Sequence, residues 1–367
     1  MNPKNIVMVR SHSMGVGDVL RSSAAWASIK KKWPDANLHL LFLSRHQGYP
    51  TEKLIQSHHA LASASFVTIK SAHPGDPRAK NTPWSKLKAE IQKVADQIKP
   101  DLIIDFEPHG LRTTLVTRAL KKMSGARTVG IAQFPGRSWF YDLASPSVKH
   151  FMRTHGLTAP MDYTLRDYVA LAALGIEREG QAIELNVSPE GENHRDRLLQ
   201  EKKGSMPWIG LNIGCGTADA LAKRPPLNDL AEGLIRLARN HNFELILTGA
   251  PFEKVINEAF IDAVKLLIPA GEECPFVIRD LAGTKDLLEL AGVISACDVF
   301  VSSDSGPYHM AVALGLPTLL WLELWEPSSI HRGTTLRHLM KPQVEEFVQA
   351  LEDLLALAKP PILKSAA

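Results

Sequence analysis

Cysteine is scarce in this chain, with three residues among 367: Cys215, Cys274 and Cys297. They lie far apart and form no Cys-x-x-Cys pair, and the fourteen histidines make no cluster with them at the spacing of metal ligands. We therefore expect neither a disulfide framework nor structural zinc, and no metal site. A chain of this kind is typical of a reduced, cytoplasmic compartment.

Long hydrophobic runs are also missing. The uncharged stretch 311–322 is interrupted by Pro317, and its length of about a dozen residues is too short to cross a bilayer. The opening residues, MNPKNIVMVR, lead directly into a strand pattern and lack the layout of a secretory signal. The sequence predicts no membrane-spanning segment.

Positive charge is concentrated in the first half. Residues 1–184 hold 25 Lys and Arg against 15 Asp and Glu, although the whole chain has a net charge of only +3. This asymmetry favours attraction to an anionic acceptor or to a membrane surface, and a plain solvated surface stays an equal alternative. We do not expect nucleic acid as a partner, because aromatic residues are not interleaved with the basic ones and no helix-turn-helix or finger spacing occurs.

Short apolar runs alternate with longer helical patterns, which predicts an α/β fold with parallel sheets. In the first half we expect strands at Ile6–Val9, Leu38–Leu43, Phe66–Ile69, Leu102–Asp105 and Thr128–Ile131, and helices at Asp18–Trp33, Trp84–Ile98 and Leu111–Lys121. A polar stretch at 188–204 precedes a second series. Its strands are expected at Trp208–Asn212, Glu244–Leu247, Val299–Val301 and Thr318–Trp321, and its helices at Leu227–Asn240, Pro251–Leu267, Lys285–Ile294 and Pro307–Leu314.

The expected architecture is two Rossmann-like domains, 1–185 and 205–342, facing each other across a central cleft. A third segment, 343–367, carries a last helix at Val344–Leu357, which is a candidate to pack back on the first domain. Ligands of open α/β sheets bind at the carboxyl ends of the strands, so the strand-to-helix turns are the candidate sites.

The first such turn is Ser-His-Ser-Met-Gly-Val-Gly-Asp, residues 11–18. An acid is unsuited to holding phosphate, so the functional interpretation of Asp18 is a general base for an acceptor hydroxyl. The alternative is a helix N-cap, a position that aspartate favours. Met14 and Gly17 of the same turn are candidate substrate contacts.

Two further turns belong to the second half. Gly214, Gly216 and Thr217 offer backbone N–H groups and a hydroxyl, and Lys223 follows as a cation. This combination suits a diphosphate that no Mg²⁺ neutralises, although a connecting loop with a surface Lys-Arg pair explains it equally well. Glu253 follows a glycine turn, and its carboxylate can accept hydrogen bonds from ribose hydroxyls. From the residue alone, the better explanation is that an acid in the first turn of a helix interacts favourably with the helix dipole.

The fourth turn follows a buried strand and reads Asp-Ser-Gly-Pro-Tyr-His-Met-Ala, residues 304–311. Free N–H groups around Ser305 and Gly306, at the start of a helix, predict an anion pocket. Asp304 and His309 lie beside this helix start, which favours a functional over a structural histidine.

The four turns, in this order, resemble glycosyltransferase family 9, which includes the ADP-heptose:lipopolysaccharide heptosyltransferases. The run at 304–317 resembles that family's signature D-[ST]-G-x-x-H-x-A-x-A-x-G-x-P, and the segment beginning at Asp280 resembles its "LaGktsLreLa" segment. The resemblance implies a GT-B fold and an inverting transfer that needs no metal or cofactor. It implies an anionic glycan or glycolipid acceptor on the first domain, a nucleotide-sugar donor on the second, and peripheral contact with the inner membrane.

Residue by residue, the resemblance implies that Asp18 is the catalytic base. It implies donor contacts at Thr217, Lys223, Glu253, Asp304, Ser305, Gly306 and His309. The chain departs from the family pattern at Pro225, where tryptophan is common, and at Glu323, where glycine is usual. Both changes lie on the donor side. They leave open the identity of the nucleotide or the sugar more than the reaction type. Two other interpretations also stay open: a GT-B transferase or epimerase that uses another nucleotide sugar, and a nucleotide-sugar binder without activity.

Overall fold

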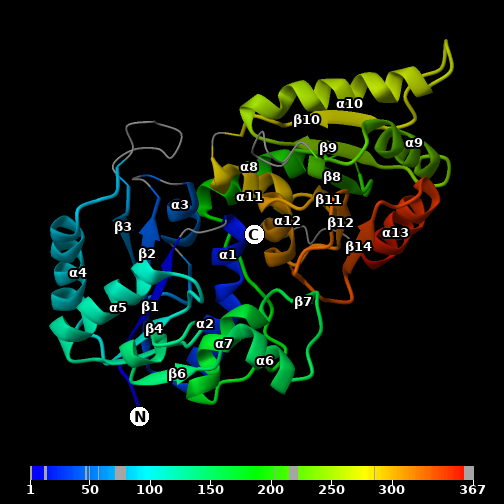
Figure 1. Cartoon of the computed structure of the whole chain (residues 1–367). Helices are drawn as coiled ribbons and strands as arrows, with labels where there is room; N and C mark the ends of the chain where they lie inside the picture. The colour runs from blue at the N-terminus through cyan, green and yellow to red at the C-terminus, as the bar shows by residue number, and fades with distance from the viewer. Residues whose placement is uncertain are drawn as a thin grey trace. The chain divides into compact units, whose positions relative to one another are not determined.

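The computed structural model describes residues 2–11, 15–45, 48, 50–56, 58–70, 80–202, 204–214, 222–284 and 286–358. It divides into two compact units: residues 1–186 with 328–330, and residues 187–327 with 331–367. Each unit is a parallel α/β layer structure of the Rossmann type (Figure 1). Among the described residues, no helix is both long and apolar enough to cross a membrane.

The first unit is built on a six-stranded parallel sheet. Its strands, in spatial order, are β3 (Ser63–Thr68), β2 (Asn37–Ser44), β1 (Asn5–Ser11), β4 (Leu102–Asp105), β5 (Arg127–Ile131) and β6 (Leu143–Ser145). The helical segments are α1 (Val16–Leu20), α2 (Ser22–Lys32), α3 (Pro50–Gln56), α4 (Trp84–Ile98), α5 (Leu111–Ser124), η1 (Arg137–Phe140), α6 (Val148–Thr154), α7 (Leu165–Leu171) and η2 (Ala172–Leu174). A short strand, β7 (Met161–Asp162), pairs with β13 (Ser329–Ile330) from the late part of the chain.

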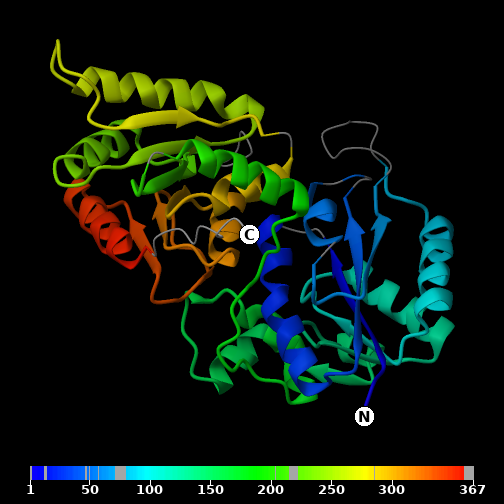
Figure 2. The ribbon, with the colours of Figure 1, turned by 180° about the vertical axis from the view of Figure 1, so that it is seen from behind.

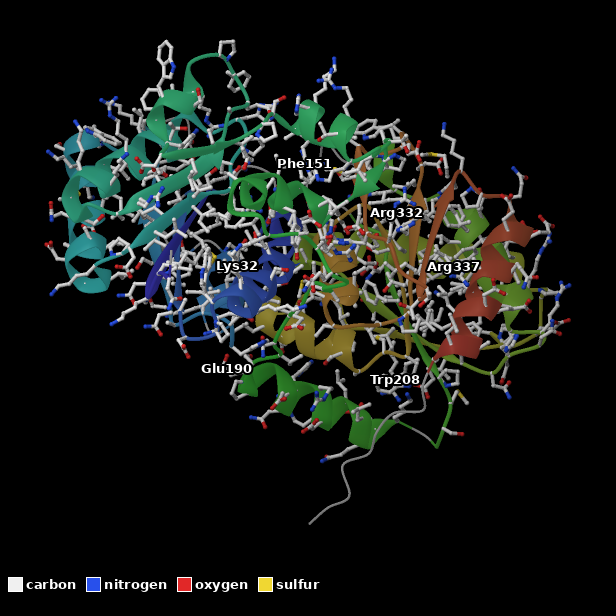
Figure 3. The ribbon with its side chains drawn as sticks, turned by 90° about the horizontal axis from the view of Figure 1, so that it is seen from below. Lys32, Phe151, Glu190, Trp208, Arg332 and Arg337 are labelled. Carbon is white, nitrogen blue, oxygen red and sulfur yellow. The ribbon has the colours of Figure 1, made fainter. Side chains whose placement is uncertain are left out.

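Side chains alternate along the strands and so bury both faces of this sheet. Val7 and Val9 of β1 pack beneath α4 and α5, whereas Ile6 and Met8 pack with α2 and α7 on the other face. Seen from behind, α1 and α2 run one after the other (Figure 2). Phe151 of α6 is buried in the second of these cores (Figure 3).

The second unit repeats the same strand order. Its sheet runs β10 (Val277–Asp280), β9 (Glu244–Thr248), β8 (Trp208–Asn212), β11 (Val299–Ser303), β12 (Thr318–Leu322) and β14 (Leu336–Met340). The helical segments are α8 (Pro189–Glu201), α9 (Leu227–Leu237), η4 (Pro251–Glu253), α10 (Lys254–Leu267), α11 (Leu287–Ser295), α12 (Gly306–Ala313) and α13 (Val344–Leu357). In each sheet the strand order reverses beside the first strand, between β1 and β4 and between β8 and β11, which is where such sheets bind ligands.

The prediction of two α/β domains of the Rossmann type is confirmed, since each unit has its own parallel six-stranded sheet. The strands at Leu102–Asp105 and Trp208–Asn212 and the helix at Trp84–Ile98 match to the residue. The expected helix Asp18–Trp33 is instead two helices that meet at Arg21.

The polar stretch 188–204 contains α8, which the sequence analysis missed. Ser188 caps it, because its hydroxyl accepts from the Gly191 N–H at 3.1 Å. The helix lies close against α11, since a Cβ on Gly292 would stand 2.4 Å from the Gly191 carbonyl oxygen. Lys202, at the end of α8, lies over the ring of Trp208, which is labelled in Figure 3. A helix this polar gives no apolar periodicity to detect.

The last helix, α13, was a candidate to pack on the first domain. Its apolar face lies in the core of the second unit, where Phe347 and Leu351 pack with residues of α9 and β12. Phe347 is placed so closely that a Cβ on Gly233 of α9 would stand 2.4 Å from its ring. Hydrophobic contact with α9 therefore fixes this helix to its own unit.

Candidate active site

Asp18 lies in the first turn of α1, directly after the central strand β1. Gly15 is at the N-cap of this helix and has a φ of 138°, a conformation that suits glycine. Among the described residues, no side chain caps this end of the helix. The interpretation of Asp18 as a helix N-cap is therefore wrong, and its carboxylate is directed to other partners.

The Asp18 carboxylate is buried, and only one of its two oxygens has partners among the described residues. Its Oδ1 is paired with the guanidinium of Arg21 and accepts a hydrogen bond from the Tyr163 hydroxyl at 3.1 Å. Its Oδ2 is buried and has no hydrogen-bond partner among the described residues. One oxygen is thus fixed, and the other is left to accept a proton or a hydrogen bond from a bound molecule.

The charges around Asp18 keep it ionised. Burial would raise the pKa of this carboxyl, but Arg21, followed by Arg10 and Arg166, outweighs burial and holds the pKa below the usual value of aspartate. The Tyr163 hydrogen bond acts in the same direction. A carboxylate that stays charged at neutral pH is ready to receive a proton without first losing one.

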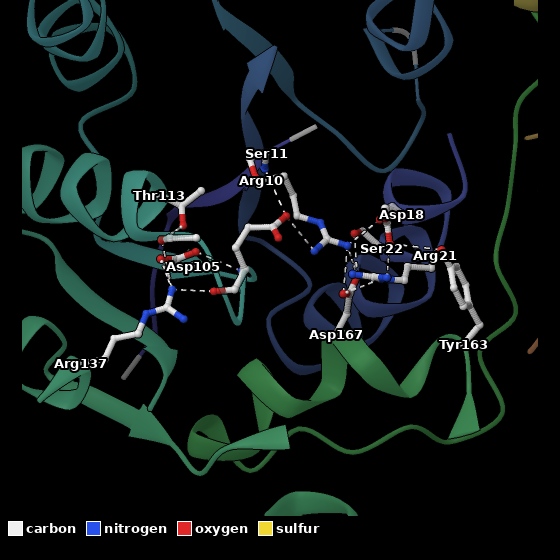
Figure 4. Close-up of polar contacts among 12 residues, drawn as sticks. Arg10, Ser11, Asp18, Arg21, Ser22, Asp105, Thr113, Arg137, Tyr163 and Asp167 are labelled. Carbon is white, nitrogen blue, oxygen red and sulfur yellow. Dashed lines mark hydrogen bonds and ion pairs between the residues drawn. The ribbon is translucent and has the colours of Figure 1, made fainter. Parts of the chain in front are cut away.

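Asp167 of α7 holds two of the cations near Asp18, Arg10 and Arg21 (Figure 4). Its fully buried carboxylate accepts hydrogen bonds from Arg10 at 2.9 and 3.0 Å, from the Arg21 Nε at 3.0 Å and from the Ser22 hydroxyl at 2.6 Å. Arg10 also donates to the backbone carbonyl of Asp18 at 2.5 Å. The network joins β1, α1, α2 and α7. It therefore restricts the movement of Asp18.

A second polar cluster lies at the end of β4, beside the end of β1. Glu107 accepts from the Arg10 guanidinium at 3.3 Å and from the Ser11 N–H at 3.2 Å. Asp105 accepts from the Tyr141 hydroxyl at 2.7 Å and pairs with Arg137 at 3.3 Å. Burial raises the pKa of Asp105 to about 6, and Arg137 opposes this only in part.

Asp18 was a candidate from the sequence, whereas its neighbours Arg10, Tyr163, Arg166 and Asp167 were not predicted. Arg10 carried the one usable signal, since it is an arginine at the end of an otherwise apolar strand. The other three lie about 145 residues further along the chain than Asp18, and they carry no local motif. Only the fold brings them together.

A pocket of about 930 Å³ in the first unit has a basic lining. The polar residues that line it are His109, Gln133, Ser147, Lys149, His150, Arg153 and Arg166. Within the described ranges, the lining contains three cations and no acidic residue. Arg166 forms no hydrogen bond or salt bridge with any residue of the described part, although the Asp18 charge acts on it. This cation is therefore available to an anionic group bound near Asp18.

In the second unit, hydroxyl and amide groups gather where β8, β9 and β11 end. Asn212 donates to the Gly214 carbonyl at 2.8 Å, and the Ser303 hydroxyl donates to the same carbonyl at 2.9 Å. The Ser305 hydroxyl lies 3.1 Å from the Ser302 hydroxyl and 3.4 Å from the Asn212 side-chain nitrogen. These bonds hold Gly214, the last described residue after β8, close to the start of α12.

Lys223 and Asp304 are paired at 2.8 Å beside the start of α12. The Lys223 ammonium also lies 5.5 Å from the centre of the Trp325 ring. Both residues line a small pocket with Trp321 and Glu323. Glu323 accepts a hydrogen bond from the Trp321 indole at 3.1 Å, so the residue that replaces the usual glycine is itself tied to the pocket wall.

Glu253 and His309 are both held by neighbours in the second unit. Glu253 is buried and accepts from the Ala250 N–H at 2.7 Å, as an acid at a helix start does. Its carboxylate fills the space beside Gly214, because a Cβ there would stand 1.8 Å from Oε1. The His309 Nδ1 lies 2.8 Å from the Nε2 of buried His331.

Seven of the predicted site residues of the second unit are therefore described, and they gather at the carboxyl ends of β8, β9 and β11: Gly214, Lys223, Glu253, Asp304, Ser305, Gly306 and His309. Gly17 is buried in α1 beside Asp18. Met14, Gly216 and Thr217 lie outside the described residues. No group of three His, Cys, Asp or Glu side chains within the described part has the geometry to hold a metal ion.

The chain matches known proteins over most of its length. The family model described as "Glycosyltransferase family 9 (heptosyltransferase)" matches residues 123–322. A segment of 158 residues is 22% identical to the lipopolysaccharide core heptosyltransferase OpsX of Haemophilus influenzae. That segment covers 43% of this chain and 41% of the relative.

Two solved structures share the fold along nearly the whole chain. The first is a family 9 glycosyltransferase from Veillonella parvula, which is 15% identical with a TM-score of 0.72; the match covers 97% of this chain and 98% of the Veillonella chain. The second is the ADP-heptose lipopolysaccharide heptosyltransferase II of E. coli, which is 18% identical with a TM-score of 0.64; the match covers 96% of this chain and 99% of the E. coli chain.

The Asp167 network predicts a measurable effect on stability. Asp167→Ala removes the shared partner of two buried arginines, so we expect the free energy of unfolding to fall by about 3–5 kcal/mol. Urea denaturation measures the change. The exposed Asp196, paired with the neighbouring Arg195, supplies the control, because Asp196→Ala should change stability by less than about 1 kcal/mol. Equal effects of the two variants would contradict a structural role for Asp167.

Proposed function

This chain belongs to glycosyltransferase family 9 and is a glycosyltransferase, and we propose that it moves heptose from ADP-heptose to an anionic glycan of the lipopolysaccharide core. The family match and the names of its relatives support the donor and the class of acceptor. The observation that carries the proposal is the buried, ionised Asp18 with one oxygen unpartnered among the described residues. A protein that only binds nucleotide sugars needs no such group.

In the proposed reaction, Asp18 acts as the general base. Its Oδ2 takes the proton of an acceptor hydroxyl while that oxygen forms a bond to the anomeric carbon of the donor. The bond from this carbon to the diphosphate breaks, and ADP leaves with the electron pair. Attack from the face opposite the diphosphate inverts the configuration. Arg21 and Tyr163 fix Oδ1, so Oδ2 is the oxygen that receives the proton.

The leaving diphosphate is proposed to lie at the start of α12. Lys223 supplies a cation, and the N–H groups around Ser305 and Gly306 are those that a helix start leaves without partners. These groups can stabilise the charge that develops on the diphosphate. We propose that no metal or cofactor is needed for this step. Glu253 remains a proposed ribose contact, and Asp304 is proposed to orient Lys223 through their salt bridge.

The acceptor is proposed to bind with its anionic group in the basic pocket of the first unit. Arg166 lines that pocket and also acts electrostatically on Asp18, so a group bound by Arg166 places its neighbouring hydroxyls near the base. Lys149 and Arg153 add to the positive potential there. A glycolipid acceptor would make the chain a cytoplasmic protein that works at the inner face of the membrane.

We expect purified protein to transfer heptose from ADP-heptose to a truncated lipopolysaccharide core acceptor, with product detected by mass spectrometry. The reaction is expected to proceed unchanged in EDTA, because cationic side chains and helix N–H groups replace a metal. UDP-glucose and ADP-glucose serve as competing donors. Faster transfer from either would refute heptose as the sugar, and a loss of activity in EDTA that Mg²⁺ restores would refute the metal-free step.

Asp18→Asn should lower kcat by roughly 100-fold or more, since the amide keeps the shape but cannot take the proton. Binding of ADP, measured by calorimetry, should be unchanged.

Because the pKa of Asp18 is depressed, kcat/KM of the native enzyme should fall only when the pH drops below the ordinary range of aspartate. Tyr163→Phe removes a hydrogen bond that lowers this pKa and should move the acid limb upward. A variant at Asp18 that keeps more than about a tenth of the native kcat would rule out a catalytic base.

Lys223→Ala and His309→Ala should each weaken ADP binding by roughly 10- to 100-fold, the value of one charge-assisted hydrogen bond. Calorimetric titration of ADP measures this directly. Lys265→Ala is the matched control, because Lys265 lies on α10 and pairs only with exposed Asp262 among the described residues. Unchanged ADP affinity in both site variants would show that the diphosphate binds elsewhere.

A further inference from the structure

His309 of α12 is paired with a second histidine, His331, which was not among the predicted site residues. The His309 Nδ1 lies 2.8 Å from the His331 Nε2, a hydrogen-bond distance. The two rings are inclined at 76° with their centres 5.1 Å apart, so the contact is edge-on and is made through these nitrogens. The two residues are 22 positions apart in the chain. The fold, and no local motif, brings them together.

The two histidines differ in their exposure to solvent. His331 is only 2% exposed, whereas His309 is partly exposed. Burying a polar ring costs free energy unless its polar atoms are hydrogen-bonded. An apolar side chain of similar size would fill the space around His331 without that cost. The bond to His309 is therefore something that a histidine supplies at this position and an apolar residue does not.

The place of His309 on its helix directs its ring to the proposed diphosphate site. α12 begins at Gly306, so His309 lies in its first turn. Side chains of a helix lean toward the N-terminus of that helix. The ring thus leans toward the end at which the N–H groups around Ser305 and Gly306 lie. Because Nδ1 is bonded to His331, Nε2 is the nitrogen through which His309 would contact an anion there.

The direction of the bond between the two rings decides what His309 offers to that anion. A neutral imidazole carries a hydrogen on one of its two nitrogens and a lone pair on the other. The oxygens of an ionised diphosphate accept hydrogen bonds and do not donate them, so the His309 Nε2 must carry the hydrogen. The His309 Nδ1 is then an acceptor, and the His331 Nε2 must be the donor. With the hydrogen on Nδ1 instead, Nε2 would turn a lone pair toward the diphosphate and repel it.

We propose that His331 is a positioning residue for the donor. Its Nε2–H donates to the His309 Nδ1 and so holds His309 in the tautomer whose Nε2–H binds the diphosphate. The inference rests on the proposed function, in which His309 contributes to binding the diphosphate. It adds a buried residue that acts through His309 and has no contact of its own to make with the donor.

A neighbouring pair of residues supplies a matched control. Tyr308, also in the first turn of α12, is buried, and its hydroxyl lies 2.9 Å from the Nε2 of His338. Burial lowers the pKa of His338 to about 4, and the charge of Arg332 acts in the same direction. His338 is therefore a neutral histidine that holds the same helical turn at neutral pH. Its printed bond is to the tyrosine, so it has no part in choosing the tautomer of His309.

Calorimetric titration of ADP into the full chain tests the proposal. His331→Leu should weaken ADP binding roughly three- to tenfold, the value of one neutral hydrogen bond. His331→Gln should stay within about twofold of the native chain, because the amide N–H of glutamine can replace the donor. In a chain that already carries His309→Ala, His331→Leu should have no further effect, since its partner is gone. His338→Leu should change the affinity by less than about twofold.

The outcomes separate this inference from the proposed function. If His309→Ala weakens ADP binding but His331→Leu does not, the diphosphate site stands and the role of His331 is refuted. The same holds if His331→Leu is equally harmful with and without His309, or if His338→Leu matches it, because the effect would then be one of packing. Unchanged affinity in His309→Ala would overturn both the diphosphate contact and the inference.

Nitrogen-15 NMR of the histidine rings observes the tautomer in the native chain and needs no variant at His331. With ADP bound, the His309 signal, recognised by its absence from the spectrum of His309→Ala, should show the hydrogen on Nε2 and none on Nδ1. A hydrogen on Nδ1, alone or together with one on Nε2, would overturn the proposal, because His309 would then be the donor to His331. This result would stand even if His331→Leu failed to fold.

Discussion

The buried Asp167 carboxylate, held between Arg10 and Arg21, is the interaction on which the polar site of the first unit depends. It joins β1, the junction of α1 and α2, and α7, which are far apart in the sequence. Arg21 is shared, because the same guanidinium also holds one oxygen of Asp18. Asp167 therefore fixes Arg21, Arg21 fixes Asp18, and the pKa of Asp18 follows from the arrangement of all three. In a buried network of this kind, removing one member leaves the others with unpaired charge.

The two units place polar groups at equivalent points of the same topology but use different chemistry there. In the first unit, the ends of β1 and β4 carry ionised groups, among them Arg10 and Glu107. In the second, the ends of β8 and β11 carry amide and hydroxyl groups, among them Asn212 and Ser303. Charged partners can set the pKa of a neighbouring acid, whereas hydroxyl and amide groups position a turn without neutralising an incoming anion. The charged groups of the first unit therefore suit a site where a carboxylate accepts a proton, and the amide and hydroxyl groups of the second unit suit a site that binds an anion.

How much the sequence could predict depended on how local each signal was. The strand and the helix start that flank Asp304 were predictable, because a strand, a glycine-containing turn and a helix start lie next to one another in the chain. Asp167 and Tyr163 were not, since their significance comes from contact with residues about 145 positions earlier. The edge strands β10 and β14 were missed because they are only half buried or exposed, so their sequences lack the continuous apolar run of a central strand. Asp18 itself was found, but its alternative explanation as a cap could be rejected only once Gly15 was seen at that position.

The basic first half of the chain also separates into two kinds of positive charge once the structure is considered. Arg10 and Arg21 are buried and neutralised by carboxylates within a few ångströms, so they contribute little to the field outside the protein. The cations of α5 and α6 have almost no acidic residues near them in the sequence, and the one present, Asp142, already has a lysine partner. A count of charges cannot distinguish these cases. Internal cations set the pKa of Asp18, whereas unneutralised cations on the surface attract anions. The charge asymmetry of the sequence therefore reflects both the buried network around Asp18 and a basic surface that faces outward.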